Sequence, residues 1–413
     1  MRTYRRTAAL AAGVALVTAG CNGGPGGGGG KISDGKIEIA VLNDQSGVYA
    51  DLSGKASVEA VKMAIADFKA KYGGKAVAKK IEVTTADHQN KPEVASSKAQ
   101  ELYDRQRADI ILDVPTSSAA LAVAGVAKSK KKIFMDIGAG TTALEGAQCN
   151  KYTFHYGYNT YMLAHGTGDT ITQDGAKNWY IIYPDYAFGQ DMTKSFSAAI
   201  KGAGGTIVKN DPTPFPSDNF STFLLKAPGL NPKPQVLGAM QAGGDLVNLV
   251  KQYNEYGLRK KGIGLAVGLM FLTDIHSVGP DALAGTKFSD AWYWNASPDN
   301  RAWADRFLAK TGKRPTFAHA ANYSAALQYL EAVQRAGTDK SDAVVKQLEG
   351  YKFGDVFAKN GTIRAQDHLL LHDAYLAQVK PSAEVKEPWD YEKILKTIPA
   401  DQAFQQPDAA CGL

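Results

Sequence analysis

Apolar residues follow two different spacings along the first part of the chain. Short, continuously apolar runs predict buried strands, and apolar residues that recur every three or four positions predict helices that cover them. The predicted strands are residues 37–42, 81–85, 109–114 and 133–137, and the predicted helices contain residues 58–68, 91–107 and 117–128. Because strands that alternate with helices pair in parallel, this part of the chain predicts a parallel α/β sheet.

The same alternation begins again in the second part of the chain. Strands are predicted at residues 178–183, 206–209, 235–240 and 263–267, with helices at 188–202, 219–226 and 244–256. Trp292, Tyr293 and Trp294 are predicted to lie on a strand where the chain returns to the first unit, before helices at 300–310 and 319–335. Roughly 380 residues follow the N-terminal leader, more than one hydrophobic core holds comfortably, so two α/β lobes are expected.

The composition of residues 1–20 is typical of a signal peptide. Three arginines precede an apolar stretch, residues 8–19, that is too short for a transmembrane helix. The sequence Thr-Ala-Gly-Cys follows and resembles a bacterial lipobox with Thr in place of Leu, which predicts lipidation of Cys21. Ordinary signal-peptidase cleavage after Ala19 is the alternative. Residues 21–35 contain a run of glycines and are predicted to form a tether.

Two other cysteines, Cys149 and Cys411, remain if Cys21 is lipidated. An exported protein is oxidised after export, which favours a disulfide between them. This bond would hold the C-terminal tail, residues 381–413, against the middle of the chain. It would stabilise the fold by about 3–5 kcal/mol in the loop-entropy model.

Charge and motifs argue against several other functions. The formal net charge is +6, half of it from arginines of the leader, and the lysine run at 130–132 has no aromatic or basic stripe beside it, so no nucleic acid is expected. Residues 138–143 fit the dinucleotide pattern G-x-G-x-x-A but do not form the first strand-to-helix turn, so no cofactor is expected. No catalytic or metal-binding motif occurs, and we expect no enzyme. We assign Asp113, Asp136 and His155 to structural roles.

Several short motifs occur in the same order as in one family of binding proteins. They are residues 43–50 (NDQSGVYA), 86–92 (ADHQNKP), 115–118 (PTSS), 138–142 (GAGTT), 184–189 (PDYAFG) and 241–245 (QAGGD). From about residue 36 to its end, the chain resembles the type I periplasmic binding proteins, the branched-chain amino-acid-binding group of ABC transporters. The last three motifs and the Ala-Ala-Cys ending are most similar to a subgroup associated with aromatic and other organic acids.

This resemblance implies two doubly wound parallel-sheet lobes joined by three crossovers, near Tyr158, Asn295 and Gly361. The implied first lobe is residues 36–157 and 295–360, and the implied second lobe is residues 158–294 and 361–380. It further implies a monomer in the periplasm, attached to a membrane only through the lipid, that closes its lobes on a small molecule and serves an ABC permease and ATPase. A component that presents its ligand to a signalling receptor is the alternative.

Candidate ligand contacts lie where predicted strands end and helices begin. Ser117 and Ser118 follow one strand, and Ala139, Gly140 and Thr141 follow the next. Hydroxyl groups and free N–H groups at such helix starts can bind a carboxylate. Simple helix capping by the same side chains is the alternative interpretation.

Aromatic side chains are predicted on the opposite walls of the cleft. Tyr49, Tyr186 and Phe188 lie in loops after strands and could hold the apolar body of a ligand. By resemblance, Gln241 and Ala242 belong to the contact region of the second lobe.

Residues 268–271 are apolar where, by resemblance, amino-acid-binding relatives offer a carboxylate to the ammonium group of the ligand. An unpaired ammonium in a closed cleft would be costly. A small organic acid, in particular an aromatic carboxylate, is therefore the expected ligand. Branched-chain amino acids, with Asp274 as the compensating carboxylate, and amides or urea are the alternatives.

Overall fold

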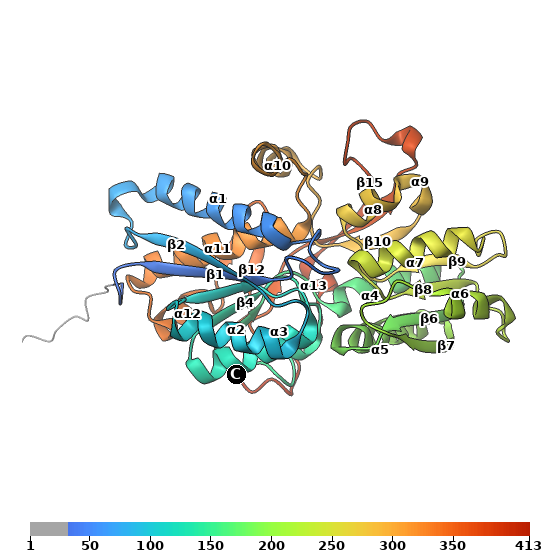
Figure 1. The fold of residues 1–413 in the computed structure, drawn as a ribbon, viewed down its shortest axis with the longest axis horizontal. Coiled ribbons are helices and arrows are strands. Elements are labelled where there is room, and N and C mark those ends of the chain that lie inside the picture. Colours follow the sequence, from blue (N-terminus) through green and yellow to red (C-terminus); the bar gives the residue numbers. More distant parts are fainter. Residues whose placement is uncertain (1–31) are drawn as a thin grey trace, which may run out of the picture. The chain divides into compact units, whose positions relative to one another are not determined.

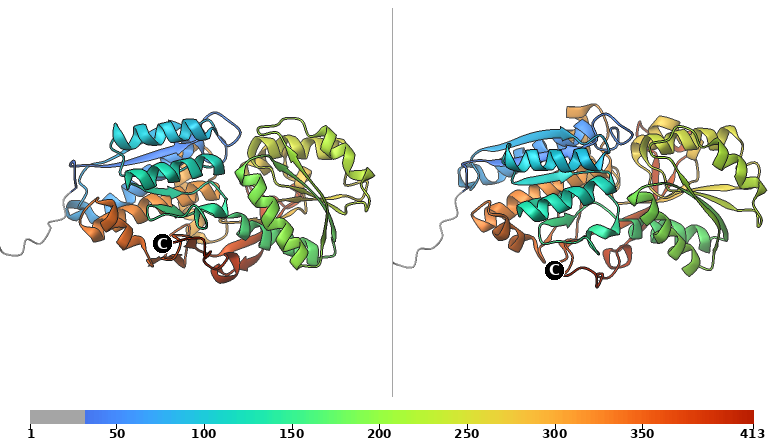
Figure 2. Two further views of the ribbon diagram at one scale, coloured as in Figure 1. Left: turned by 90° about the horizontal axis from the view of Figure 1, so that it is seen from below. Right: turned by 60° about the horizontal axis from the view of Figure 1, so that its bottom comes forward.

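The computed structural model describes residues 32–413. The predicted signal peptide, the lipidation site Cys21 and residues 21–31 of the tether lie outside the described residues. Two parallel sheets, each covered by helices, form two lobes (Figures 1 and 2). Among the helices of residues 32–413, none combines the length and apolarity that a membrane span requires.

Lobe 1 is built on a five-stranded parallel sheet with the order β2-β1-β3-β4-β5. Its strands are β1 (Ile37–Asn43), β2 (Ile81–Asp87), β3 (Ile110–Asp113), β4 (Ile133–Asp136) and β5 (Thr153–His155). Its helices are α1 (Gly54–Tyr72), α2 (Pro92–Asp104), α3 (Ser117–Lys130), α10 (Pro298–Thr311), α11 (Phe317–Ala336) and α12 (Ser341–Leu348). Three very short strands, β11 (Lys352–Phe353), β12 (Gly361–Ile363) and β13 (Leu370–Leu371), complete the lobe.

Helices cover both faces of the lobe 1 sheet, which explains why its strands are continuously apolar. On β1, the side chains of Ile39 and Val41 belong to one buried cluster and those of Ala40 and Leu42 to another. Helices α1 and α11 pack together on the first face, and α2 and α3 pack together on the second. The carboxyl ends of the strands consequently meet at one edge of the sheet.

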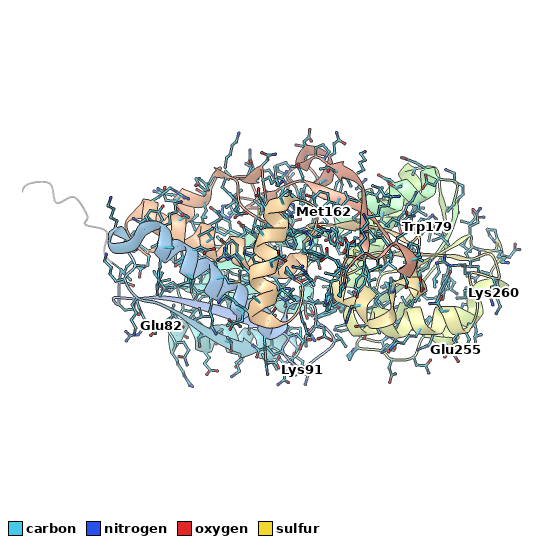
Figure 3. The ribbon with its side chains drawn as sticks, turned by 90° about the horizontal axis from the view of Figure 1, so that it is seen from above. Glu82, Lys91, Met162, Trp179, Glu255 and Lys260 are labelled. Carbon is cyan, nitrogen blue, oxygen red and sulfur yellow. A yellow bond between two sulfur atoms is a disulfide. The ribbon has the colours of Figure 1, made fainter. Side chains whose placement is uncertain are left out.

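Lobe 2 has a four-stranded parallel sheet with the order β7-β6-β8-β9. Its strands are β6 (Asn178–Pro184), β7 (Thr206–Thr213), β8 (Val236–Ala239) and β9 (Gly264–Val267). Its helices are α4 (Thr160–Gln173), α5 (Ala187–Gly202), α6 (Ser221–Lys226), α7 (Gly243–Glu255), α8 (Leu272–Val278) and α9 (Pro280–Leu283). Figure 3 labels Glu82 and Lys91 on lobe 1 and Trp179, Glu255 and Lys260 on lobe 2.

A three-stranded antiparallel sheet lies on the lobe 2 side of the crossovers. It contains β10 (Lys287–Asp290), β14 (Ala374–Val379) and β15 (Glu392–Ile398), and it packs against α4. The first crossover lies between β5 and α4, and the second between β10 and α10. The fold is therefore the predicted pair of parallel-sheet lobes joined by crossovers.

The third crossover comes later than the resemblance implied. Gly361 lies on β12, which pairs with β11 and β13, and Leu369 bridges to His155 at the end of β5 in lobe 1. The chain enters the lobe 2 sheet only at β14. Lobe 1 thus keeps residues 361–371, because backbone pairing with β5 holds them there.

The C-terminal tail is not a simple extension after residue 380. It first contributes β15 to the antiparallel sheet and forms α13 (Ala400–Ala403). It then returns to lobe 1, where Cys411 forms a disulfide with Cys149, with the two Cα atoms 5.5 Å apart. The C-terminus lies at lobe 1 in each view of Figures 1 and 2.

The predicted strand at Trp292, Tyr293 and Trp294 is wrong. The strand is β10, which ends at Asp290, and the three aromatic residues follow it in the second crossover. The indole N–H groups of Trp292 and Trp294 donate to the carbonyls of Val356 and Trp389, at 2.7 and 2.9 Å. Their apolar side chains are buried within the crossover, and this burial, not a strand, accounts for the apolar run in the sequence.

Candidate functional site

A small cavity lies between the two lobes, beyond the carboxyl ends of both parallel sheets. This is the edge at which open α/β sheets bind ligands. The cavity has a volume of about 10 Å³, far below the about 300–1,000 Å³ typical of sites for drug-sized ligands, so its walls are packed together in this state and the lobes must part to admit a ligand. Its lining residues are Tyr49, Leu52, Pro115, Gly138, Tyr158, Tyr186, Phe188, Ala242, Leu269 and Phe271. None of these residues carries a charge, so the walls suit the apolar body of a ligand once the lobes have parted.

Aromatic rings from both lobes pack around this cavity. The hydroxyls of Tyr49 and Tyr186 are 2.7 Å apart and join the lobes through a hydrogen bond. The Tyr186 ring stacks on Phe215 with centroids 4.3 Å apart. The Phe317 ring stacks on the lining residue Phe271, with centroids 4.7 Å apart. Burial raises the pKa of both Tyr49 and Tyr186 well above the usual value, so both phenols are neutral.

The carbonyl groups of the loop after β4 accept hydrogen bonds from neighbouring residues of the chain. The Tyr158 hydroxyl donates to the Gly138 carbonyl at 2.9 Å, and a ring nitrogen of His155 lies 2.8 Å from the Ala139 carbonyl. The Thr160 N–H donates to the Gly140 carbonyl at 2.8 Å.

A trans peptide directs each carbonyl opposite to the N–H that follows it. The N–H groups of Gly140 and Thr141 therefore point away from His155 and Thr160. Neither N–H donates to another group in residues 32–413. A Cβ at Gly140 would lie 2.8 Å from the Tyr158 ring and 3.2 Å from the Phe188 ring, so this backbone directly adjoins the cavity wall.

The start of α3 offers further donors near the same edge. Ser117 is fully buried, and its hydroxyl has no hydrogen-bond partner within the described chain. The Thr116 side chain donates to the Asn90 side-chain oxygen and does not cap α3. Ser118, one residue further, is partly exposed. The first turn of α3 is thus left without a side-chain cap.

The structure brings some, but not all, of the predicted contact residues to the cavity. Tyr49, Tyr186, Phe188 and Ala242 line it, and Gly140 adjoins its wall. The remaining predicted residues, Ser117, Ser118, Ala139, Thr141 and Gln241, do not line it. The Thr141 hydroxyl accepts from the Ala143 N–H at 3.3 Å, and the Gln241 amide donates to the Thr213 hydroxyl at 3.3 Å.

Six lining residues were absent from the predicted contacts: Leu52, Pro115, Gly138, Tyr158, Leu269 and Phe271. Gly138 and Pro115 belong to motifs recognised in the sequence, and a Cβ on Gly138 would lie 2.6 Å from the Cα of Pro115. Leu269 and Phe271 belong to the apolar stretch noted after β9. Phe317, at the start of α11, carries no signal in the sequence that connects it with the cavity.

Two buried carboxyl groups lie near the cavity on lobe 2, but neither lines it. Asp274 accepts from the Phe271 N–H at 2.9 Å and from the Gly243 N–H, and burial raises its pKa to about 7. Asp245 accepts from the Ser217 N–H at 3.0 Å, and burial raises its pKa to about 7. Asp274, the carboxylate considered above as a partner for a ligand's ammonium group, therefore already accepts hydrogen bonds from two backbone N–H groups. Within the described residues, no cluster of His, Cys, Asp or Glu is arranged to hold a metal ion.

Main-chain contacts also join the lobes beside the cavity. The Gly244 N–H at the start of α7 donates to the Val48 carbonyl of lobe 1 at 3.0 Å. Asp191 of α5 accepts from the N–H of Thr142 at 2.8 Å. The structure therefore represents a state in which the lobes are closed over the cavity.

Two parallel-sheet lobes that close over a small uncharged cavity define a two-lobed solute-binding protein. The model of the periplasmic binding protein family matches residues 36–384, and the chain belongs to this family. It is a periplasmic solute-binding protein of the ABC-transporter type, and its relatives are binding proteins, not enzymes.

Similar solved structures agree with this assignment. A periplasmic binding protein from Burkholderia mallei is 43% identical, with a TM-score of 0.87, and the match covers 92% of this chain and 99% of that one. A branched chain amino acid ABC transporter periplasmic ligand-binding protein from Burkholderia xenovorans is 35% identical, with a TM-score of 0.79 over 91% and 100% of the two chains. A solute-binding protein from R. palustris in complex with benzoate shares the fold at 21% identity, with a TM-score of 0.78 over 92% and 100%.

Proposed function

We propose that the protein binds a small aromatic carboxylate in the interlobe cavity and delivers it to an ABC permease. The observation that carries this proposal is the cavity lining, which is aromatic and aliphatic and has no charged side chain. Such walls favour a flat apolar ring, and neutral donors at one edge suit a carboxylate. The benzoate complex of the R. palustris protein shows that the same fold accommodates such a ligand.

The N–H groups of Gly140 and Thr141 and the hydroxyl of Ser117 are the proposed carboxylate donors. N–H groups whose carbonyls are held elsewhere form a concave anion site that requires no positive side chain. Hydrogen bonds to a charged acceptor are roughly twice as strong as neutral ones, which offsets part of the desolvation of the anion. The Tyr49 and Tyr186 hydroxyls share one hydrogen bond, which leaves the second hydroxyl proton to donate to a polar substituent on the ring.

A branched-chain amino acid is the second candidate, because the similar Burkholderia xenovorans protein is described as belonging to such a transporter. Its side chain would suit the apolar walls. Its ammonium group, however, would face no lining carboxylate, and Asp274 already accepts two backbone N–H groups. A buried ammonium without a partner is strongly unfavourable.

Isothermal titration calorimetry with protein that has been unfolded and refolded to remove any retained ligand tests the proposal. We expect binding of benzoate or a hydroxybenzoate and at least tenfold weaker binding of leucine and benzamide. Phe188→Ala should lower the affinity at least tenfold, because this ring lines the cavity. Phe223→Ala, which removes a partly buried ring of α6, is the control and should leave the affinity unchanged. Leucine bound more tightly than every aromatic acid would contradict the proposal.

We also propose that the protein is tethered to a membrane through lipidated Cys21, as the Thr-Ala-Gly-Cys sequence indicates. In the producing cell, Cys21→Ala should move the protein from the membrane fraction to the soluble periplasmic fraction. Equal membrane recovery of both forms would overturn the tether while leaving the ligand proposal intact.

A further inference from the structure

A buried charged pair lies directly behind the loop that holds the proposed carboxylate donors. His155 ends β5 and is 1% exposed, and Glu145 follows the short 3-10 helix at Thr142–Leu144 and is also 1% exposed. The His155 Nδ1 lies 2.5 Å from a Glu145 carboxylate oxygen, and its Nε2 lies 2.8 Å from the Ala139 carbonyl. One ring therefore connects Glu145 to the peptide that precedes Gly140.

The geometry requires a proton on both ring nitrogens. A carbonyl oxygen only accepts, so Nε2 must donate to Ala139. Nδ1 faces a carboxylate whose other oxygen accepts from the amides of Asn159 and Gln405, at 2.7 and 3.0 Å. A carboxylate that receives these donors is stabilised in its charged form, and His155 is then an imidazolium.

The groups that face His155 agree with this assignment. Burial opposes the charge on His155, but attraction to Glu145 raises its pKa to about 9. Burial also opposes the charge on Glu145, yet His155 holds the pKa of Glu145 below its usual value. Asp136, whose carboxylate oxygen lies 3.5 Å from Nε2, has its pKa raised well above the usual value by burial, and Asp113 lies beyond it. The positive charge of His155 and the negative charge of Glu145 therefore balance each other in this cluster.

We propose that His155, supported by Glu145, is a positioning residue for ligand binding: it holds the Ala139 carbonyl behind the loop and thereby fixes the Gly140 and Thr141 N–H groups for a carboxylate. This inference rests on the proposed function, since it concerns the same site. His155 does not line the cavity and acts only through the Ala139 peptide.

Two physical effects lead to the proposal. Without a donor at His155, the Ala139 carbonyl would be buried and unpaired, and the peptide would rotate to find another partner. That rotation would turn the Gly140 N–H away from the cavity. In addition, an imidazolium bonded to the carbonyl polarises the peptide and makes its N–H a stronger donor to an anion.

The test compares benzoate with benzamide, which has the same ring and no charge. In His155→Asn, the shorter amide cannot reach the Ala139 carbonyl, and we expect the ratio of benzoate to benzamide affinity to fall at least tenfold. His155→Gln can place its amide near the Nε2 position and should restore part of this ratio. His372 supplies the matched control: it is 1% exposed, its Nε2 lies 2.9 Å from the Gly157 carbonyl, and His372→Asn should leave the ratio unchanged.

Glu145→Gln is a second variant that keeps His155 in place but removes its charge partner. Here the benzoate affinity should fall more steeply between pH 6 and 8 than in the wild type, because Asp245 and Asp274 titrate in both proteins and His155 loses its charge only in the variant. A benzoate-to-benzamide ratio that survives in both His155→Asn and Glu145→Gln would overturn the inference and leave the proposed function standing. A wild-type protein with no preference for benzoate over benzamide would overturn the proposed function itself and the inference with it.

Discussion

At the scale of single residues, Gly140 shows how closely the loop after β4 approaches the cavity wall. The missing side chain is what allows the backbone to lie against the Tyr158 and Phe188 rings. A methyl group there would displace the Tyr158 and Phe188 rings, which form part of the cavity wall. Gly140 therefore allows the loop to pack directly against two of the aromatic residues that line the cavity.

Gly140→Ala is predicted to weaken ligand binding at least tenfold while the protein still folds, because the new Cβ would lie 2.8 Å from the Tyr158 ring. Calorimetric titration and a thermal melt would measure the two properties separately. Gly125→Ala in α3 is the control, since no atom lies within 4 Å of its Cβ position. It should raise stability by up to about 1 kcal/mol and leave the affinity unchanged.

His155 also gives the protein a pH dependence of stability. Its pKa is about 9 in the folded chain and about 6.5 in an unfolded one. The stabilisation is therefore complete below pH 6.5 and is lost as the pH rises through 9. Asp274, with a pKa of about 7, has largely finished titrating before this upper range.

Between pH 7.5 and 9.5, urea denaturation should show the free energy of unfolding falling by roughly 1–3 kcal/mol. His155→Gln should remove most of this decrease, because the amide that replaces the imidazole has no proton to lose in this range. His372→Gln should retain it, since burial lowers the pKa of His372. If His155→Gln showed the same decrease in the free energy of unfolding, groups other than His155 would be responsible for it.

At the scale of elements, the long periodic segments were predictable and the short ones were not. Helices α5, α7 and α11 and the buried strands of both parallel sheets follow the predicted residues within a few positions. Strand β5 has only three residues, too few for a period to be recognised. Strand β15 is mostly exposed and lacks an apolar run, so its partner β14, and not its own sequence, determines it.

Helix α4 was not predicted either, although Asn159 provides a standard start signal. The Asn159 side chain accepts from the Met162 N–H at 2.9 Å and donates to Glu145 at 2.7 Å. The helix contains glycine and threonine, which weaken its periodic signal. The same side chain thus begins the first helix of lobe 2 and supports the charged pair in lobe 1.

Asn159→Ala should lower the free energy of unfolding by about 0.5–2 kcal/mol through loss of the cap, with a further loss of ligand affinity through Glu145. Ser297→Ala removes an equivalent cap from α10, where the Ser297 hydroxyl accepts from the Asn300 N–H at 3.2 Å. Urea denaturation should show a loss for both variants, larger for Asn159→Ala because this side chain also donates to the buried Glu145 carboxylate, whereas calorimetry should show weaker ligand binding only for Asn159→Ala. Unchanged ligand affinity in both variants would show that the start of α4 does not influence the ligand site.

At the scale of the whole described chain, contacts between the lobes depend on residues that are distant in sequence. The Val48 carbonyl meets the Gly244 N–H, and Tyr49 meets Tyr186. The sequence indicated that both loops follow parallel strands and therefore lie at the edge where ligands bind. It could not show which residues meet across the cavity, because that depends on how the crossovers orient the lobes. For this reason Tyr186 was predicted, whereas Phe317 was not.

Gly243→Ala is predicted to hinder closure. Its φ is +58°, and a Cβ would lie 2.3 Å from the Val48 carbonyl oxygen of the other lobe. Gly257→Ala is the matched control, because its φ of +62° imposes the same backbone strain with no atom within 4 Å. Small-angle X-ray scattering with saturating ligand should show a larger radius of gyration, and calorimetry a weaker affinity, for Gly243→Ala alone. Equal behaviour of the two variants would contradict this role.

The disulfide between Cys149 and Cys411 makes most of the chain a covalent ring. The two cysteines are 262 positions apart, and the whole of lobe 2 lies between them. A mechanical load applied between the two ends of the described chain would pass from lobe 1 through the sulfur atoms to the tail. Lobe 2 would then bear no tension, and stretching would extend only the segments outside the ring until a reductant opened it. Lobe 2, which closes over the cavity, is thus mechanically shielded from strain between the two ends of the described chain.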